Sequence, residues 1–202
     1  MRFLVTGGAG FIGSHLVDSL IDSNHDVVVI DNETAPENEN FYWNNKAENY
    51  KYDICDFNKI ENLFKNIDCV FHLAAESRIQ TAMKNPTKTF RVNFIGTLNV
   101  LKACKQYKID RILYSSTSSY YGLKNDVPLV EDMDRDCLNP YSSSKVAGED
   151  LVKMYSKLYN IRSVIFRYFN VYGERQPTKG QYAPVVGLFQ KMKFKGKPMT
   201  VV

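Results

Sequence analysis

The amino-acid sequence predicts an α/β fold, a doubly wound parallel sheet with helices on both of its faces. Short apolar runs suited to strands alternate along the chain with longer segments of helical period. A glycine-rich turn follows the first of these runs, and small or polar residues follow the later ones. Ligands of such sheets bind beyond the carboxyl ends of the strands. One crevice is therefore expected at that edge, lined by Gly7, Asp31, Asp53, Ala74, Ser116 and Asn170.

Six segments carry the runs expected of strands: 3–5, 27–30, 50–54, 69–73, 111–115 and 163–167. Helices are expected after Gly13 and in 58–66, 86–107 and 141–159. The Asn-rich stretch 32–49 is expected to be a long connection or a short irregular helix. Residues 1–174 should form the sheet domain. Residues 175–202 should begin a small C-terminal substrate domain that is truncated, because the chain stops in an apolar run without a polar tail.

Composition narrows the class of protein. A chain of 202 residues, 44% of them hydrophobic, can bury one core of good size. No apolar run resembles a signal-peptide core or a membrane span, so we expect a cytoplasmic protein without a membrane partner. The cysteines lie far apart, with no Cys-x-x-Cys pair and no nearby His cluster, at Cys55, Cys69, Cys104 and Cys137. They are expected to be reduced thiols, and no metal site is predicted.

The positive charge is confined to the end of the chain. The formal net charge is +4, yet residues 175–202 contain one Arg, five Lys and no acidic residue, so residues 1–174 are net negative. A basic segment of this kind is typical of a solvated helix end. Nucleic acid is therefore not expected as a partner.

The glycine-rich segment that ends at Gly13 lies between a strand and a helix. Gly7 lets the chain turn sharply, Gly10 lets backbone amides approach a pyrophosphate, and Gly13 lets the helix pack closely on the sheet. Unpaired amides and the helix dipole favour an anion there without Lys or Arg. The pattern predicts a Rossmann-type dinucleotide site, rather than a plain glycine turn, made by Gly7, Gly10, Phe11, Ile12 and Gly13.

An acidic residue at the end of the second strand indicates which dinucleotide binds. Asp31 follows the apolar run 27–30 and lies 18 residues after Gly13. A carboxylate there accepts hydrogen bonds from the adenosine ribose and repels a 2′-phosphate, which favours NAD over NADP. The neighbouring Asn32 leaves open the alternative of an Asp that only ends a strand in a turn.

Three Tyr-x-x-x-Lys pairs occur, and their context separates them. Two lie in expected connections and begin at residues 42 and 120. The third, Tyr141 with Lys145, follows the helix-start pair Asn139-Pro140. An apolar stripe at helical spacing is expected to face the core through Ala147, Leu151, Met154 and Leu158. Tyr141 and Lys145 should then face a site instead of the core.

Tyr141 and Lys145 are neighbours on the helix surface, so the ammonium can act on the phenol. A phenol of pKa near 10 is a poor base at neutral pH. An ammonium at about 4 Å favours the phenolate by on the order of 4 kcal/mol, and the charge of an oxidised nicotinamide adds to this. Tyr141 is therefore a candidate general base with Lys145 as its electrostatic partner. Two solvated helix residues are the alternative.

A hydroxyl-rich segment follows the fifth expected strand. Four consecutive Ser or Thr residues come directly after Ser115 and end at Ser119. Such groups could hold a sugar hydroxyl and share its proton with Tyr141, although a Ser-rich turn would have the same composition.

In this order the motifs resemble the extended short-chain dehydrogenase/reductase family, the NAD-dependent sugar epimerases and dehydratases. The likeness covers almost the whole chain. It rests on the blocks TGGAGFIGSHL (6–16), DN (31–32), DI (53–54), HLAA (72–75), VNFIGT (92–97), SST and YYG (115–122), YSSSK (141–145) and RYFNVYG (167–173).

The resemblance also implies roles for single residues. Beyond the glycine turn and Asp31, the cofactor residues that it implies are Asn32, Asp53, Ile54, Leu73, Ala74, Ala75, Asn93, Ser115, Tyr141, Lys145 and Phe169. Among these, Asp53 and Ile54 would hold the adenine, and Phe169 would border the nicotinamide. Asn170 would contact the phosphates of a nucleotide sugar. The helices beginning at residues 86 and 141 would form the interface of a homodimer.

Within this family the loop after the fifth strand separates reactions. The nucleotide-sugar 4,6-dehydratases place an Asp-Glu pair directly after the Thr, where this chain has Ser118 and Ser119. Without that acid and base the loop resembles that of a 4-epimerase, with Thr117 and Tyr141 at the substrate. The implied reaction oxidises carbon 4 of UDP-glucose or its N-acetyl relative with NAD and re-reduces it on the other face.

Three other functions stay open at the level of sequence. The segment Glu76-Ser77-Arg78 resembles the dehydratases, which keeps a 4,6-dehydratase among the alternatives. A UDP-glucuronate epimerase or decarboxylase is the second. The third is an NAD-binding fragment without turnover, because the chain lacks most of the small domain that, by resemblance, closes over the sugar.

Overall fold

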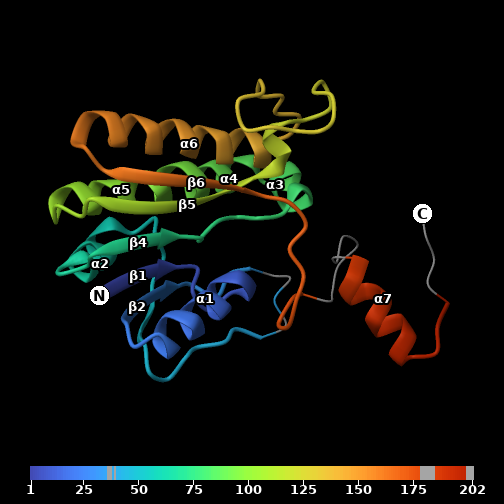
Figure 1. Cartoon of the computed structure of the whole chain (residues 1–202), viewed down its shortest axis with the longest axis horizontal. Coiled ribbons are helices and arrows are strands. Elements are labelled where there is room, and N and C mark those ends of the chain that lie inside the picture. The colour runs from blue at the N-terminus through green and yellow to red at the C-terminus, as the bar shows by residue number, and fades with distance from the viewer. Residues whose placement is uncertain (36–37, 39, 178–184, 199–202) are drawn as a thin grey trace.

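The computed structural model describes residues 1–35, 38, 40–177 and 185–198. Its centre is a six-stranded sheet of order β3-β2-β1-β4-β5-β6, in which every neighbouring pair is parallel (Figure 1). The strands are β1 (Arg2–Thr6), β2 (Asp26–Asp31), β3 (Glu48–Lys51), β4 (Cys69–His72), β5 (Arg111–Thr117) and β6 (Arg162–Tyr168). The order reverses between β1 and β4, which opens a crevice at the carboxyl ends of the strands. The predicted parallel α/β sheet is confirmed.

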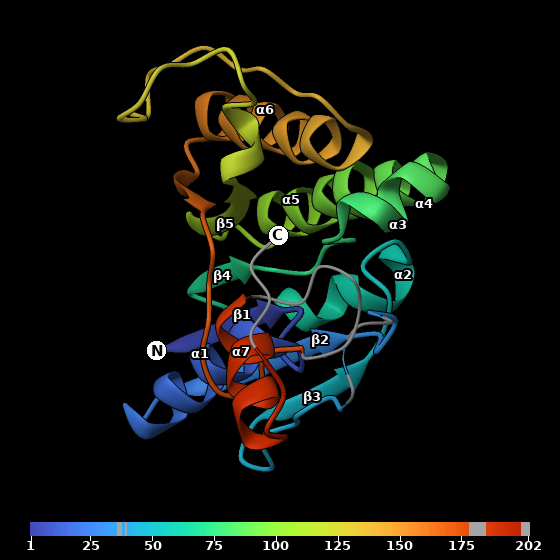
Figure 2. The same cartoon turned by 90° about the vertical axis from the view of Figure 1, so that its right-hand side faces the viewer.

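Helices lie on both sides of the sheet. α1 (Phe11–Asp22) packs on β1 and β2, whereas α5 (Thr97–Gln106) and α6 (Pro140–Tyr159) pack on each other and on β4, β5 and β6. Figure 2 shows α1 on one side of the sheet and α5 on the other. α7 (Val185–Phe194) belongs to the basic C-terminal segment and lies beyond the carboxyl ends of the strands in Figure 1.

Alternate residues of the strands enter two separate cores. Leu4 and Val28 pack into the larger core with side chains of α5 and α6. Val5 and Val29 point to the opposite face and pack with Val17 of α1. Because side chains alternate along a strand, burial on both faces requires apolar residues at successive positions. This is why β1 and β2 are continuous apolar runs.

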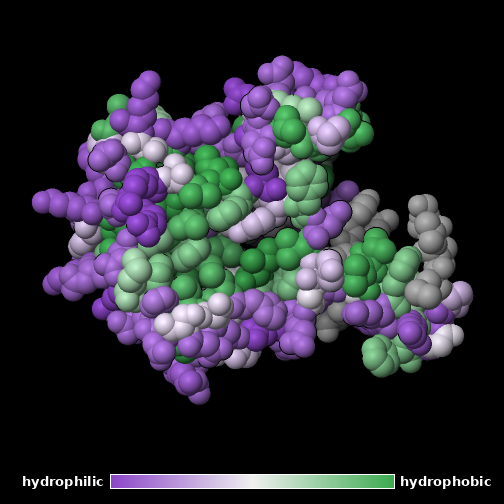
Figure 3. All heavy atoms as spheres, in the orientation of Figure 1, coloured by the Kyte–Doolittle hydropathy of each residue, from purple (hydrophilic) through white to green (hydrophobic). Residues whose placement is uncertain are grey.

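One part of the sheet has no helix over it in the described residues. On β6, Val164 is 49% exposed and Phe166 is 39% exposed. Figure 3 shows this region as a hydrophobic band between hydrophilic surfaces. Helices of the described residues therefore cover both faces of the sheet at β1 and β2, but not at the β6 edge.

The start of α6 follows the sequence signals. The Asn139 side chain accepts a hydrogen bond from Ser142 N at 2.9 Å, and the Ser142 hydroxyl accepts one from the Asn139 backbone N–H. Together they form a capping box. Pro140 occupies the first turn, where its missing N–H costs nothing. Asn160, in the left-handed conformation at φ 56°, ends the helix. These local contacts place Tyr141 in the first turn, at the crevice.

The apolar stripe expected on this helix is only partly confirmed: Leu151 is buried in the larger core, but the stripe does not continue beyond it. Met154 is 43% exposed and Leu158 is 63% exposed. The inward face instead carries Lys145, Gly148 and Glu149, which are followed by Val152 and Tyr155. At Gly148 an added Cβ would lie 2.2 Å from the Tyr114 hydroxyl, so the helix sits too close to β5 for a larger side chain. Buried polar partners on the sheet, which periodicity does not register, decided the rotation of α6.

The expected helix of residues 86–107 is interrupted. α4 (Pro86–Phe90) passes into a π-helical turn, η2 (Arg91–Gly96), before α5 begins. At Gly96 an added Cβ would come within 2.5 Å of Ile54 Cδ1, so the segment packs tightly against the chain that follows β3. Insertions of this type mark places where tertiary contacts outweigh regular helix geometry.

Other boundaries differ by a few residues. β3 ends at Lys51, so residues 53 and 54 follow the strand instead of ending it, and β5 and β6 run past their expected ends. The short helices α2 (Phe57–Ile60) and η1 (Glu61–Phe64) replace one helix over 58–66. α3 (Ile79–Lys84) and η3 (Ser118–Tyr120) were not expected. The described part of 32–47 contains neither helix nor strand, as expected for a long connection.

Candidate active site

A crevice of about 440 Å³ lies at the carboxyl ends of the strands. Its walls come from the glycine turn, the ends of β2, β4, β5 and β6, and the first turns of α6. It brings together Gly7, Gly10, Phe11, Ile12, Gly13, Asp31, Asn32, Ile54, Leu73, Ala74, Ala75, Ser115, Thr117, Tyr141, Lys145, Phe169 and Asn170. Of the predicted site residues, only Asp53 and Asn93 are not part of this wall.

The three glycines of the turn have different reasons to be glycine. Gly7 has φ +72°, and an added Cβ would lie 2.7 Å from Ala74 N. An added Cβ at Gly13 would lie 2.1 Å from the Gly7 carbonyl oxygen. At Gly10 the nearest atom to such a Cβ would be 3.4 Å away, an ordinary contact. The fold itself therefore needs Gly7 and Gly13, whereas Gly10 keeps space open in the crevice for a ligand.

Asp31 joins the end of β2 to the glycine turn. It is 9% exposed, and its two carboxylate oxygens accept the backbone N–H of Ala9 at 3.1 Å and of Glu33 at 2.8 Å. Burial raises the pKa of Asp31, and these two hydrogen bonds oppose the rise. Asp31 therefore makes the contacts expected of an Asp that ends a strand in a turn. It also lines the crevice where a ribose would lie.

The chain after β3 corrects one prediction. Tyr52 and Ile54 line the crevice, whereas Asp53 lies between them and its Oδ1 accepts the backbone N–H of Cys55 at 2.8 Å. The backbone leaves the sheet at Lys51, so the alternation places residues 52 and 54 on the crevice side. Tyr52 could have been found from the same alternation if the end of β3 had been known.

Asn93 also differs from its predicted place. It is 1% exposed and lies behind the crevice wall in the π-helical turn. Its side-chain oxygen accepts Glu76 N–H at 2.8 Å, and its amide donates to the Glu76 carbonyl at 3.0 Å and to the Ser144 hydroxyl at 2.9 Å. Asn93 therefore fixes the loop after β4 against α6.

Tyr141 and Thr117 meet at the floor of the crevice. The Tyr141 phenol lies close enough to the Thr117 side chain for Thr117 to favour the phenolate, and both residues line the crevice. Thr117 is 5% exposed, and its oxygen accepts Ser119 N–H at 3.1 Å, which starts η3. Burial raises the pKa of Tyr141, and the Thr117 side chain and the charge of Arg78 oppose that rise.

Lys145 lies one helical turn beyond Tyr141 and is 3% exposed. Its Nζ is 4.4 Å from the centre of the Tyr114 ring, close enough for a cation–π contact. Burial lowers the pKa of Lys145 to about 7, and the charge of Glu149 opposes this. The expected lowering of the Tyr141 pKa by Lys145 stays a prediction: burial is the largest effect on both groups, and the charge of Arg78 lowers the pKa of Tyr141.

Sequence reasoning did not assign several residues of the wall. Glu76 is 7% exposed and forms an ion pair with Lys88 at 2.8 Å, and Arg78 lines the crevice two residues later. Their position directly after β4 is the signal that could have identified them. The remaining unassigned lining residues are Ile30, Thr34, Ala35, Asn38, Phe41, Tyr52, Ser77, Val92, Tyr168, Val171 and Pro177. The hydroxyl-rich segment also lines the crevice, through Ser116, Ser118 and Ser119.

Two kinds of feature are absent from the residues that the structure describes. Among them, no cluster of three or more His, Cys, Asp or Glu side chains is arranged to hold a metal ion. In the same described segments, no helix has both the length and the apolar character needed to cross a membrane.

Comparison with known proteins places these observations in a family. Residues 3–201 match the NAD dependent epimerase/dehydratase family. A relative from Methanocaldococcus jannaschii, provisionally named UDP-glucose 4-epimerase, is 43% identical over 188 residues. The match covers 92% of this chain and 61% of that relative, so the chain spans less than two thirds of its length.

Solved structures share the fold over nearly the whole chain. UDP-glucose 4-epimerase from Thermotoga maritima, solved with UDP-glucose, superposes with a TM-score of 0.91 at 33% identity over 98% of this chain and 64% of its own. UDP-N-acetylglucosamine 4-epimerase from Methanobrevibacter ruminantium, in complex with UDP-N-acetylmuramic acid, gives 0.90 at 35% identity over 97% and 63%. The family description names NAD, which agrees with the cofactor predicted from the glycine turn and Asp31.

Proposed function

The chain belongs to the NAD-dependent epimerase/dehydratase family, and we propose that it acts as a nucleotide-sugar 4-epimerase on UDP-glucose or UDP-N-acetylglucosamine. The main support is that Tyr141 and Thr117 line the same crevice as the glycine turn and lie close enough to interact. In this proposal Tyr141 is the proton acceptor and the glycine turn binds the dinucleotide. The two relatives with solved structures act on UDP-sugars by name, which supports the substrate class.

The walls of the crevice fit NAD at both ends. The open space at Gly10 and the amides at the start of α1 suit a pyrophosphate, and Asp31 suits a ribose. Tyr141, Lys145 and Phe169 lie at the opposite end, where a nicotinamide would be held. Asp53 and Asn93 support the binding surface from behind in this proposal.

The proposed reaction centres on the proton of the hydroxyl at sugar carbon 4. Tyr141 takes this proton, with the Thr117 side chain beside it. Held by the glycine turn and Asp31, NAD would supply a hydride acceptor and donor for carbon 4 and a positive charge beside the phenol. Between the two half-reactions the keto sugar turns about its bond to the diphosphate, and Tyr141 then gives the proton back.

A second candidate, a 4,6-dehydratase, is favoured by one observation. Glu76 places a largely buried carboxylate in the crevice wall, and an elimination needs such a group. Against this, Ser118 and Ser119 occupy the wall where the dehydratases carry their acid and base. Mass analysis of the product separates the two reactions, because loss of water changes the mass and epimerisation does not.

We also propose that the protein forms a homodimer through α5 and α6. Met154 and Leu158 on α6 are 43% and 63% exposed, and Ile95 before α5 is 42% exposed. Paired helices would cover these apolar side chains. Analytical ultracentrifugation tests this, and a monomer at micromolar concentration would contradict it.

The decisive experiment is Tyr141→Phe in the full-length product of the reading frame. Loss of the general base should lower kcat for interconversion of UDP-glucose and UDP-galactose by about 10² to 10⁴-fold, while NAD still binds. The matched control is Tyr42→Phe, the same change in another Tyr-x-x-x-Lys pair, at a side chain that is 42% exposed. Undiminished turnover of Tyr141→Phe would refute the proposed role. NAD binding without turnover by the unmodified protein would favour a binding module.

A further inference from the structure

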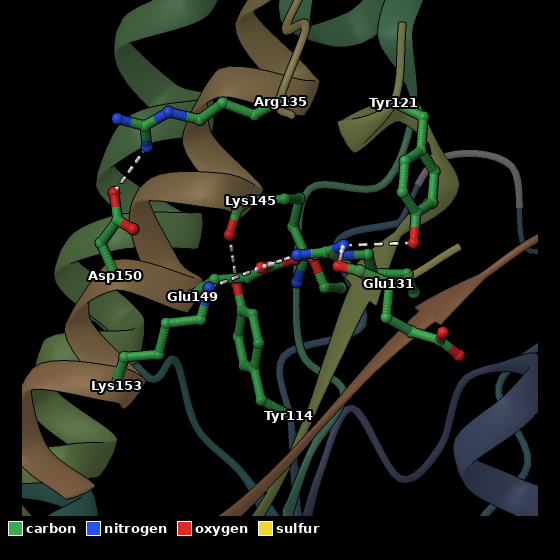
Figure 4. A network of polar contacts seen from close by, with 10 residues as sticks. Tyr114, Tyr121, Glu131, Arg135, Lys145, Glu149, Asp150 and Lys153 are labelled. Atoms are coloured by element: carbon green, nitrogen blue, oxygen red, sulfur yellow. Dashed lines mark hydrogen bonds and ion pairs between the residues drawn. The ribbon is translucent and has the colours of Figure 1, made fainter. Parts of the chain in front are cut away.

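A buried carboxylate lies behind the face of α6 that carries Tyr141 and Lys145. Glu149 has no exposed surface. Its Oε1 accepts the Ser116 hydroxyl at 2.5 Å and Arg167 Nε at 3.1 Å, and its Oε2 accepts Arg167 Nη2 at 3.0 Å (Figure 4). Lys153 approaches Oε2 to 3.6 Å from the solvent side. Taking a carboxylate this far from water is costly unless its partners are well placed.

The partners of Glu149 come from the elements that carry the rest of the site. Ser116 directly precedes Thr117 on β5, so its hydrogen bond fixes the strand end that holds the partner of the phenol. Arg167 lies on β6 immediately before Tyr168 of the crevice wall. One carboxylate therefore ties α6, β5 and β6 together at the depth where their site residues meet.

Arg167 extends this network into the loop after η3. Its Nη1 donates to the Tyr121 hydroxyl at 3.1 Å and to the Glu131 carbonyl at 2.9 Å. Its guanidinium also stacks on the Tyr120 ring, 3.3 Å from the ring centre. Arg167 therefore joins η3 and the loop that follows it to the point where Glu149 ties α6, β5 and β6 together.

Glu149 is also the negative charge that acts on Lys145. The two side chains lie one turn apart on α6. From the other elements, Lys145 faces the Tyr114 ring of β5 and the buried His72 of β4, and neither supplies a negative charge. Burial lowers the pKa of Lys145 to about 7, and Glu149 opposes this lowering. Without the carboxylate, Lys145 would lose its proton at a lower pH.

We propose that Glu149 is a positioning residue of this site, whose buried carboxylate holds the Ser116–Thr117 end of β5 against α6 and keeps Lys145 cationic. The inference rests on the function proposed above for Tyr141 and Lys145. It predicts that the charge of residue 149, and not only its volume, matters for the reaction.

The first test reads Lys145 directly and needs no turnover. In the uniformly ¹³C-labelled chain, the Lys145 Cε resonance is assigned by its loss in Lys145→Met and titrated between pH 5 and 10. Glu149→Gln should lower the pKa of Lys145 by about 1. The control is Arg135→Gln, which breaks the exposed Arg135–Asp150 ion pair on the same helix and should leave the titration unchanged (Figure 4).

The second test separates positioning from stability. In the full-length product, Glu149→Gln should lower kcat about tenfold at pH 8, since a pKa lower by about 1 cuts the charged fraction of Lys145 at that pH from about a tenth to about a hundredth, and KM for the UDP-sugar should stay within about twofold. The basic limb of the kcat–pH profile should move to lower pH. A variant with a lower Tm but an unchanged Lys145 titration and unchanged kcat would overturn the proposal.

Two safeguards keep the outcome decisive. If Glu149→Gln does not fold, the double variant Glu149→Gln with Arg167→Met removes both charges of the pair and should still lower the Lys145 pKa, by less than the single variant because the Arg167 charge is also gone. An unchanged titration there overturns the inference. If the unmodified full-length protein binds NAD but does not epimerise, the proposed function fails, and the Lys145 titration still decides the electrostatic role of Glu149.

Discussion

The two walls of the crevice are built by different physical means. The wall at β1 and β2 consists of backbone and small side chains, and glycines are required there because atoms of the fold itself stand 2.1 Å and 2.7 Å from any added Cβ at Gly13 and Gly7. The wall at β5, β6 and α6 contains buried polar side chains such as Thr117 and Lys145, and the buried carboxylate of Glu149 lies behind it. In the first wall the available space decides which residues fit, and in the second wall the charges of the buried groups decide. The first should therefore respond to volume and the second to pH.

The largest effect is expected at Gly13. Gly13→Ala should lower the free energy of unfolding in urea by about 3 kcal/mol, because its Cβ would overlap the Gly7 carbonyl. Gly10→Ala is the matched control. It should change the unfolding free energy by less than about 0.5 kcal/mol and instead weaken NAD binding about tenfold in calorimetry. Equal destabilisation by both changes would contradict a wall built on shape.

A pH-dependent stability is expected from the second wall. The folded pKa of Lys145, about 7, is below its ordinary value of 10.5, so between these limits the unfolded chain holds more protons than the folded one. Stability should therefore rise with pH from 7 towards 10, with a slope from this group on the order of 1 kcal/mol per pH unit.

Urea denaturation of Lys145→Met at pH 7, 8 and 9 measures that slope. The variant should lose this slope, so the free energy of unfolding of the unmodified chain should increase relative to that of the variant as the pH rises. Lys157→Met removes an exposed lysine from the same helix and should keep the slope. A slope that survives in Lys145→Met would assign it to another group.

The cofactor preference offers a smaller effect that belongs to the first wall. Asp31→Ser removes the charge that repels a 2′-phosphate and should reduce the NAD to NADP affinity ratio about tenfold. Asp26→Ser, at the other end of β2, removes an exposed carboxylate and serves as the control. The ratio follows from fluorescence titration with the two reduced cofactors, and an unchanged ratio would assign Asp31 to the turn alone.

The smallest effect is expected from an exposed ion pair near the start of β5 and β6. Arg162 and Asp110 approach to 2.6 Å, but their side chains are 62% and 59% exposed. Arg162→Gln should cost less than about 1 kcal/mol, and the loss should vanish in about 1 M salt. A larger loss would show that surface charge, and not only buried charge, supports this half of the sheet.

The fold and the binding wall follow closely from local sequence. Gly13 is needed for a contact with Gly7 within the same turn, and the interiors of β1 and β2, 3–5 and 27–30, are apolar throughout because both of their faces are buried. Asn139 and Pro140 fix the start of α6 in the same local way. Residues whose reasons are local could therefore be assigned from the order of amino acids alone.

The failures share one cause, which is contact between distant segments. The rotation of α6 depends on Tyr114 and Ser116 of β5, and the π-helical turn depends on Ile54, Glu76 and Ser144. The end of β3 decided that Tyr52 and not Asp53 lines the crevice. Periodicity treats buried polar residues as exposed, so it predicted only part of the inner face of α6.

The sequence by itself determined the parallel sheet, the glycine turn and the set of residues that gather at the carboxyl ends of the strands, because period, turn chemistry and strand ends act over a few residues. Only the tertiary structure decided the ionisation of that set. The pKa values of Tyr141 and Lys145 depend on how deeply both groups are buried and on which charges face them: Arg78 reaches Tyr141 from the loop after β4, and Glu149 acts on Lys145 from one turn along α6. Burial is a property of the packed molecule, and no local pattern encodes it.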